Sequence, residues 1–131
     1  MKVLVLGATG LIGSHALRAL RAAGCVAIGA SRHRPADERA DDWLALDFGA
    51  MTTEQDWLPL LGGFDAVVNC VGIIREVRDR DFDRLHRAAP VALFAACERL
   101  GVRRVVQVSA LGSHPDFGTL RADQSLWTSI G

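Results

Sequence analysis

Three glycines at intervals of three residues constrain the fold of this chain more than any other feature. Gly7, Gly10 and Gly13 lie between an apolar run, residues 3–6, and a segment whose apolar residues have helical spacing, residues 11–23. A strand that turns directly into a helix leaves little room for side chains in the turn. The sequence VLVLGATGLIGSHAL therefore predicts a strand, a tight glycine turn and a helix packed closely on that strand.

Four further apolar runs have the length and composition of strands. They are continuous rather than alternating, which is typical of parallel strands covered on both faces. The five runs are residues 3–6, 26–30, 43–46, 66–71 and 104–111. No internal repeat or linker interrupts them.

Helical segments separate these runs. Apolar spacing predicts helices over residues 11–23 and about 81–100, and we expect Pro90 to kink the second. Hydroxyls at residues 52–53 can cap a shorter helix, which Pro59 and the GGFD after it should end. Alternating strands and helices predict an α/β fold, namely a Rossmann-type, three-layer, doubly wound parallel sheet of strand order 3-2-1-4-5.

The composition is that of a soluble globular protein, and we expect the protein to be cytoplasmic. Lys plus Arg number 15 and Asp plus Glu number 15, so charge predicts neither nucleic acid nor a membrane as partner. The longest apolar run, residues 89–97, is too short to span a bilayer. Cys25, Cys70 and Cys97 are odd in number and far apart, so we expect reduced thiols and no metal site.

The glycine turn has the chemistry of a diphosphate site. Without side chains, backbone N–H groups can approach a pyrophosphate closely, and the start of the next helix adds unpaired N–H groups with partial positive charge. A dinucleotide therefore needs no lysine there. The alternative is a glycine turn that binds nothing, but strand, loop and helix occur in the order that binding requires.

The glycines are spaced GxxGxxG, and VLGATGLIGSHALRAL resembles the opening of the extended and atypical short-chain dehydrogenase/reductase family. Its branch of NAD-dependent epimerase/dehydratase-like proteins and relatives of a complex I subunit is the most similar. LDF at 46–48, FDAVVNCVGIIRE at 64–76 and residues 82–116 extend the resemblance, which stops at about residue 116. It implies an NAD(P)-binding Rossmann domain over residues 1–118 and a divergent tail over 119–131.

The resemblance also implies a cofactor site at the carboxyl end of the sheet. Family members that prefer NAD usually carry an acid at the end of the second strand. Here that position reads ASRHRP, so Arg32 and Arg34 favour NADP, with NAD as the alternative and solvated surface arginines as the simpler explanation. The expected cofactor-binding residues are Gly7, Ala8, Thr9, Gly10, Leu11, Ile12, Gly13, Ser31, Arg32, Arg34, Asp47, Phe48, Cys70, Val71, Gly72 and Ser109.

Two parts of that set lie beyond the glycine turn and the second strand. Asp47 and Phe48 match the positions that hold the adenine, Asp47 by its side chain and Phe48 by its backbone, although Asp47 could be only a turn residue. Cys70, Val71 and Gly72 match the end of the fourth strand, which passes beside the adenine ribose and the nicotinamide. A side chain at Gly72 would press on the ligand.

The residue pair that would transfer a proton is missing from the sequence. Family members that move hydride use a tyrosine and, four residues later, a lysine. This chain has no tyrosine, and its one lysine, Lys2, precedes the first strand's apolar run, whereas ligands bind beyond the carboxyl ends. His86 matches the family's asparagine and Ser109 lies near its serine, but neither restores the pair. We assign no catalytic residue.

We therefore expect a binding domain with weak or no independent catalysis. The alternatives are an oxidoreductase completed by another chain and a structural protein that has lost its ligand. Family members continue with further strands and a substrate lobe, so we expect a sheet that is incomplete at its carboxyl end, by nature or by truncation or frameshift. The fifth strand would then be an exposed edge. We expect residues 119–131 to cover that edge or to join a neighbouring subunit in a homo-oligomer.

Overall fold

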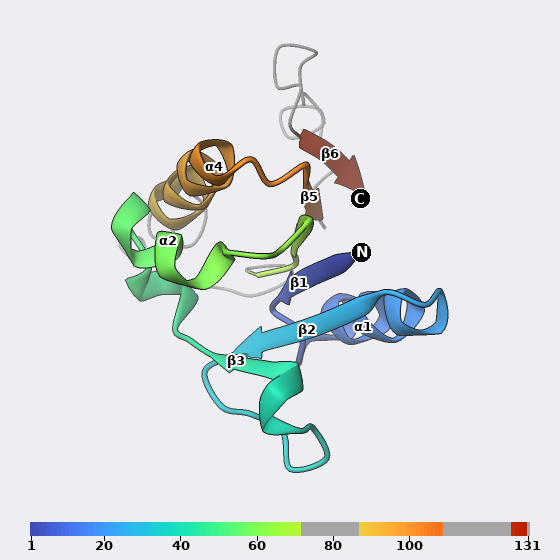
Figure 1. Ribbon diagram of the computed structural model, residues 1–131. Helices are drawn as coiled ribbons and strands as arrows, with labels where there is room; N and C mark the ends of the chain where they lie inside the picture. The colour runs from blue at the N-terminus through green and yellow to red at the C-terminus, as the bar shows by residue number, and fades with distance from the viewer. Residues whose placement is uncertain (72–86, 109–126, 131) are drawn as a thin grey trace.

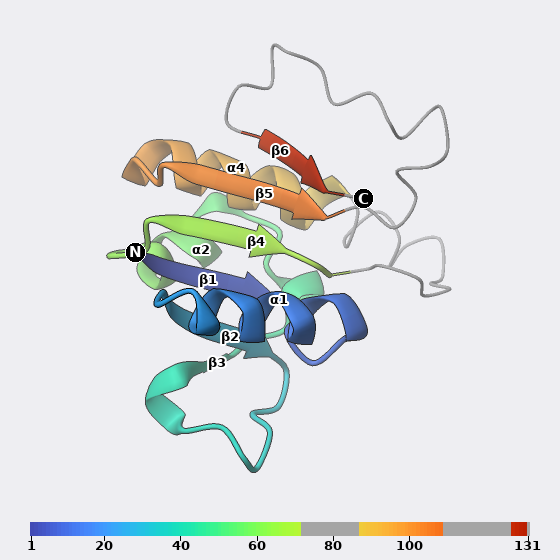
Figure 2. The same ribbon diagram turned by 90° about the vertical axis from the view of Figure 1, so that its right-hand side faces the viewer.

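The computed structural model describes residues 1–71, 87–108 and 127–130, and these form a parallel β-sheet with helices on both faces (Figure 1). Figure 2 shows α1 in front of the sheet and α2 and α4 behind it. The strands are β1 Lys2–Leu6, β2 Val26–Ser31, β3 Trp43–Ala45, β4 Ala66–Asn69, β5 Arg104–Val108 and β6 Trp127–Ile130. The helices are α1 Leu11–Ala22, α2 Glu54–Leu61 and α4 Ala89–Leu100, with 3-10 turns η1 Ala40–Asp42 and η2 Phe48–Ala50.

The strand order is β3-β2-β1-β4-β5-β6, which confirms the predicted order 3-2-1-4-5 and adds a sixth strand. β6 pairs in parallel with β5, from Val105↔Trp127 to Val108↔Ile130. No sixth strand was predicted, although residues 119–131 were expected to cover the β5 edge or to join a neighbouring subunit. Residues 127–130 pair along that edge. The proposed boundary at residue 118 lies outside the described residues.

The register aligns the strand ends that matter for binding. Leu6, the last residue of β1, is opposite Ala30 of β2 on one side and Asn69 of β4 on the other. Ends of parallel strands that stop at the same level form a common edge, and the central position of β1 places the glycine turn in the middle of it.

Buried side chains alternate between the two faces of β1. Val3 and Val5 pack with Leu17 of α1, whereas Leu4 and Leu6 belong to the cluster that contains Trp57 of α2. Each of these four β1 residues is at most 1% exposed. The strand is apolar throughout because both of its faces are covered, as the continuous pattern predicted.

Thr53 begins α2 as predicted. Its Oγ1 accepts a hydrogen bond from Asp56 N (3.3 Å), while Asp56 Oδ2 accepts one from Thr53 N (2.9 Å), which is a capping box. Pro59 and the GGFD after it were expected to end this helix, and α2 does end at Leu61 with Gly62 as its C-cap, although Pro59 itself lies inside the helix. Pro59 removes one N–H donor, and its ring crowds the carbonyl of residue 55.

Pro90 is the second residue of α4, and the two residues before this helix, Arg87 and Ala88, are π-helical. Residues 81–86 lie outside the described part of the chain, so the helix over residues 81–100 and its kink at Pro90 stay predictions. Gly101 ends α4 with a φ of +72°, as predicted from its position. None of the helices in the described ranges is long and apolar enough to cross a bilayer.

Candidate functional site

The first glycine of the turn is required by both conformation and space. Gly7 follows β1 directly and has a φ of +72°, which side chains other than glycine rarely adopt. A Cβ on Gly7 would lie 2.9 Å from the carbonyl carbon of Cys70, which is too close. The turn therefore runs against the backbone that follows β4.

The third glycine lets α1 approach the turn. A Cβ on Gly13 would lie 2.0 Å from the carbonyl oxygen of Gly7, so no side chain fits there. Gly10 differs from both. The nearest atom to a Cβ at Gly10 is the same oxygen at 3.4 Å, its φ is −75°, and the residue is exposed. The described residues give no steric reason for glycine at position 10, because the one described atom within 4 Å of that Cβ lies at an ordinary contact distance.

Among the described residues, no side chain caps the start of α1. Gly10 is its N-cap, and the first turn has no acidic residue. α2 is different, because Thr53 and Asp56 satisfy its first N–H groups. The helix end beside the glycine turn therefore keeps N–H groups and partial positive charge that an anion can use.

The end of β2 is joined directly to the glycine turn. Ala8 N donates a hydrogen bond to the carbonyl of Ala30 (3.3 Å). Ser31 ends β2, and the exposed Arg32 and Arg34 follow it. The structure thus brings these three predicted residues to the edge that also carries the turn. Arg34 Nη1 donates to the carbonyl of Glu38.

Asp47 and Phe48 lie beyond the end of β3, on the same edge. Asp47 Oδ1 accepts a hydrogen bond from Gly49 N (3.2 Å), so the carboxylate caps η2 and also remains exposed. The Phe48 ring is buried against Trp57 in an edge-to-face arrangement with 5.6 Å between ring centroids. A ligand can therefore meet only the backbone of Phe48, which agrees with the backbone role that the resemblance implies.

β4 ends at Asn69, two residues earlier than predicted, so Cys70 and Val71 follow the strand rather than end it. Cys70 N still donates to the carbonyl of Leu6 (3.0 Å). Burial raises the pKa of the Cys70 thiol to about 11, so this thiol stays protonated near neutral pH. Gly72, Ser109 and His86 lie outside the described residues.

Asn69 is a residue that the sequence reasoning missed. It is 1% exposed, its Nδ2 donates to Gln107 Oε1 (3.0 Å), and its Oδ1 accepts from Val71 N (3.0 Å). The amide thus fixes the bend that carries the chain from β4 past the glycine turn. A polar residue inside the apolar run AVVNCV was the available signal, because a buried amide must find partners.

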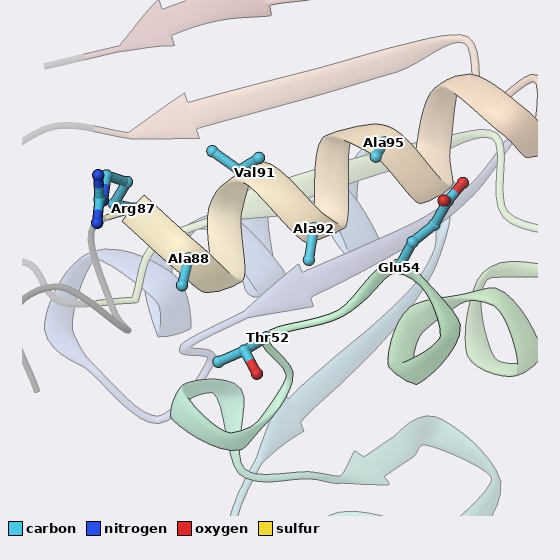
Figure 3. Close-up of a pocket in the computed structure, with 7 residues that line it drawn as sticks. All are labelled: Thr52, Glu54, Arg87, Ala88, Val91, Ala92 and Ala95. Carbon is cyan, nitrogen blue, oxygen red and sulfur yellow. The ribbon is translucent and has the colours of Figure 1, made fainter.

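A groove of about 510 Å³ lies elsewhere, between the start of α2 and one side of α4 (Figure 3). Thr52 and Glu54 face a row of small side chains on α4 across it. Its lining residues are Thr52, Glu54, Arg87, Ala88, Val91, Ala92 and Ala95. None of them belongs to the glycine turn or to the end of β2. Within the described ranges, no three His, Cys, Asp or Glu side chains cluster as metal ligands would.

Comparison with known proteins identifies a family for this chain. The model of the NAD dependent epimerase/dehydratase family matches residues 3–125. No curated protein sequence matches the chain.

Three solved structures have the same fold. UDP-N-acetylglucosamine 4-epimerase from Bacillus cereus matches with a TM-score of 0.67 at 21% identity, over 92% of this chain and 42% of that one. Uronate dehydrogenase from Agrobacterium tumefaciens matches with a TM-score of 0.65 at 22% identity, over 82% of this chain and 40% of that one. A short-chain dehydrogenase/reductase superfamily protein from A. tumefaciens with bound NAD gives 0.66 at 24% identity, over 88% and 34%. This chain spans less than half the length of each.

Proposed function

We propose that this chain, which belongs to the NAD dependent epimerase/dehydratase family, binds a dinucleotide across the carboxyl end of its sheet. The pyrophosphate would lie against the backbone from Gly7 to Gly13, and the adenosine half would extend toward the ends of β2 and β3. The observation that carries the proposal is Gly10. The packing of the described residues explains Gly7 and Gly13, whereas those residues would leave room for a side chain at Gly10.

The start of α1 supports this position for the pyrophosphate. A helix end without a cap, reached through a turn that excludes side chains, offers N–H donors to phosphate oxygens without a lysine. The proposed binding set remains that of the sequence analysis. Asp47 would accept hydrogen bonds from the adenosine in addition to capping η2, because a carboxylate has several acceptor sites.

NADP is the cofactor we propose, with NAD as the alternative. No acidic residue ends β2, and Arg32 and Arg34 follow it, which favours a 2′-phosphate over free ribose hydroxyls. NAD has support from the short-chain dehydrogenase/reductase superfamily protein from A. tumefaciens, whose structure was solved with NAD. A bound dinucleotide would supply hydride chemistry at its nicotinamide ring.

We propose weak or no independent catalysis. The chain has no tyrosine. The Lys2 ammonium lies 4.7 Å from the centre of the Phe64 ring, and Lys2 begins β1. Gly7, the first residue of the glycine turn, is five positions further along the chain, which in a strand is on the order of 15 Å. Lys2 therefore cannot take the part of the missing lysine. An oxidoreductase completed by another chain remains the second candidate, and a structural protein without ligand the third.

A cytoplasmic homo-oligomer also remains part of the proposal. The β5 edge is paired with β6, so contact between subunits through that side of the sheet would use the outer edge of β6.

Titration of the purified, dialysed protein with NADP and with NAD tests the proposal. Gly10→Val should weaken the affinity for either dinucleotide at least tenfold, because its side chain occupies the space that the pyrophosphate needs. Gly62→Val is the matched control, since Gly62 has a φ of −59° and a Cβ there would meet nothing within 4 Å. Both variants should unfold within a few degrees of the wild-type protein.

The outcomes separate the three candidates. A wild-type protein that binds neither dinucleotide would favour the structural protein, and unchanged affinity in Gly10→Val would show that the site is elsewhere. Oxidation of NADPH by the isolated chain with a range of carbonyl substrates would contradict weak catalysis, and oxidation that appears only when a second chain is added would favour the oxidoreductase completed by another chain.

A further inference from the structure

The chain segment after β2, residues 32–38, is held at its first end by the Ser31 hydroxyl. Ser31 Oγ accepts a hydrogen bond from Trp43 Nε1 (2.9 Å) and donates one to the carbonyl of His33 (2.6 Å). A hydroxyl has a single hydrogen to donate. While the Ser31 hydroxyl donates this hydrogen to the His33 carbonyl, it cannot donate to a phosphate. Ser31 instead fixes the backbone on both sides of Arg32.

The partner of Ser31 is itself rigidly placed. Trp43 is 6% exposed and is opposite Gly29 in the β2–β3 register. A Cβ on Gly29 would lie 2.3 Å from the Trp43 ring, so the indole packs directly on the bare strand. The hydrogen bond from Trp43 to Ser31 therefore comes from a side chain that has little freedom to move.

The second end of the segment is held by Glu38. Arg21 of α1 forms a bidentate ion pair with the Glu38 carboxylate, with N–O distances of 2.9 and 3.1 Å. Arg21 Nε also donates to the carbonyl of Ala27 in β2 (3.2 Å). The Arg21 and Glu38 side chains are 33% and 18% exposed, so water screens this pair only partly. Glu38 is thus tied to both a helix and a strand of the core.

The two arginines of the segment differ in what they contact. Arg34 Nη1 donates to the carbonyl of Glu38, so its guanidinium is engaged within the segment. Arg32 is exposed and makes no hydrogen bond or ion pair with any described residue. It is also the nearer to the glycine turn, because the Ala30 carbonyl, two residues earlier, accepts from Ala8 N.

We propose that Arg32 alone supplies the cation for the 2′-phosphate of NADP, and that Ser31, Arg34 and Glu38 are positioning residues that hold the segment carrying it. This inference rests on the proposed function and narrows its binding set: Ser31, Arg32 and Arg34 were all candidates for the phosphate, and only Arg32 is now assigned to it. Arg32 is the specificity-determining residue, and the network from Trp43 to Arg21 keeps its backbone at the edge of the site.

A pair of charge-removing variants tests the division between the arginines. Arg32→Gln should raise the Kd for NADP at least tenfold and leave the Kd for NAD unchanged. Arg34→Gln should change both by less than threefold, because a neutral amide can still donate to the Glu38 carbonyl. The affinity for NADP should fall with added salt in the wild-type protein and in Arg34→Gln, and less steeply in Arg32→Gln.

The positioning role needs a separate measurement. Glu38→Gln removes the charge that pairs with Arg21, and should raise the Kd for NADP threefold to tenfold while speeding amide hydrogen exchange over residues 32–38 in the free protein. Ser31→Ala and Trp43→Phe should each weaken NADP binding, and the double variant no more than the stronger single one. A loss in Ser31→Ala with none in Trp43→Phe would show that Ser31 contacts the phosphate itself.

Failure of this inference is distinguishable from failure of the proposed function. A wild-type protein that binds NADP no more tightly than NAD overturns the NADP preference, and with it the need for a phosphate cation. A wild-type preference for NADP that survives Arg32→Gln, or that Arg34→Gln reduces as much, overturns only the division proposed here. Unchanged NADP affinity and exchange in Glu38→Gln overturns the positioning role.

Discussion

The carbonyl oxygen of Gly7 occupies the space that a side chain on Gly13 would need, at 2.0 Å from an ideal Cβ. We expect Gly13→Ala to force α1 away from the turn and to lower the free energy of unfolding by about 2 kcal/mol or more, as overpacking in a tight core does. Chemical denaturation measures this.

Gly10→Ala is the matched control for that prediction. Its Cβ would be 3.4 Å from the same oxygen, and its φ of −75° suits alanine. The loss should be below about 1 kcal/mol, which is typical of an unfavourable N-cap. Equal losses in the two variants would contradict the close approach of α1 at Gly13.

We expect the hydrogen bonds of the Asn69 amide to contribute to the free energy of unfolding. Asn69→Leu leaves Val71 N–H without its acceptor and Gln107 without its donor, and should cost about 1–3 kcal/mol of unfolding free energy. A double-mutant cycle with Gln107→Ala isolates the contact between the two amides, and a coupling energy near zero would show that they do not interact.

The three thiols should differ in reactivity. Burial raises the pKa of Cys70 to about 11 and that of Cys97 to about 12, whereas Cys25 is only half-buried. At about pH 8 a thiol reagent should therefore modify Cys25 in the folded protein well before the other two, because thiolates are the reactive form. All three should react at similar rates in denaturant. Rapid modification of Cys70 in the folded protein would contradict its burial, and mass spectrometry identifies the site.

Because of the capping box of α2, the free energy of unfolding should decrease at low pH. Hydrogen bonds from the backbone N–H and then the hydroxyl of Thr53 hold the pKa of Asp56 below its usual value of 3.8. A carboxyl whose pKa is lower in the folded state stabilises the fold above the unfolded pKa, and this contribution is lost as the pH falls through the folded pKa.

Asp56→Asn keeps an acceptor for Thr53 but removes the titration. The stability difference between wild type and Asp56→Asn should therefore be constant above about pH 5 and shrink as the pH falls toward about 2. Thermal unfolding across this range measures it. A difference that does not change with pH would mean that the carboxylate of Asp56 has no special stability in the fold.

Features encoded in short stretches of sequence were predictable. The strand order followed from continuous apolar runs separated by helical patterns, the capping role of Thr53 from its place before the helix, and the end of α4 from Gly101. Each depends on residues only a few positions apart, so backbone sterics and hydrogen bonding with near neighbours decide it.

Two features depend on tertiary contacts that local preference does not show. Pro59 is a helix breaker by its chemistry, but Trp57 and Leu61 on either side of it are buried, and their packing keeps α2 intact. β6 was missed because Trp127–Ile130 has little apolar pattern of its own, and its hydrogen bonds go to β5, about twenty residues earlier.

By itself, the sequence determined the class of fold and the place of the glycine turn, because periodicity and missing side chains act locally. Only the tertiary structure decided which of the three glycines packing requires, that Asn69 meets Gln107, and that Arg21 and Ser31 hold the segment around Arg32. These relationships join residues from different elements, and their partners are set by how helices and strands pack. No pattern within a short stretch of sequence encodes such partners.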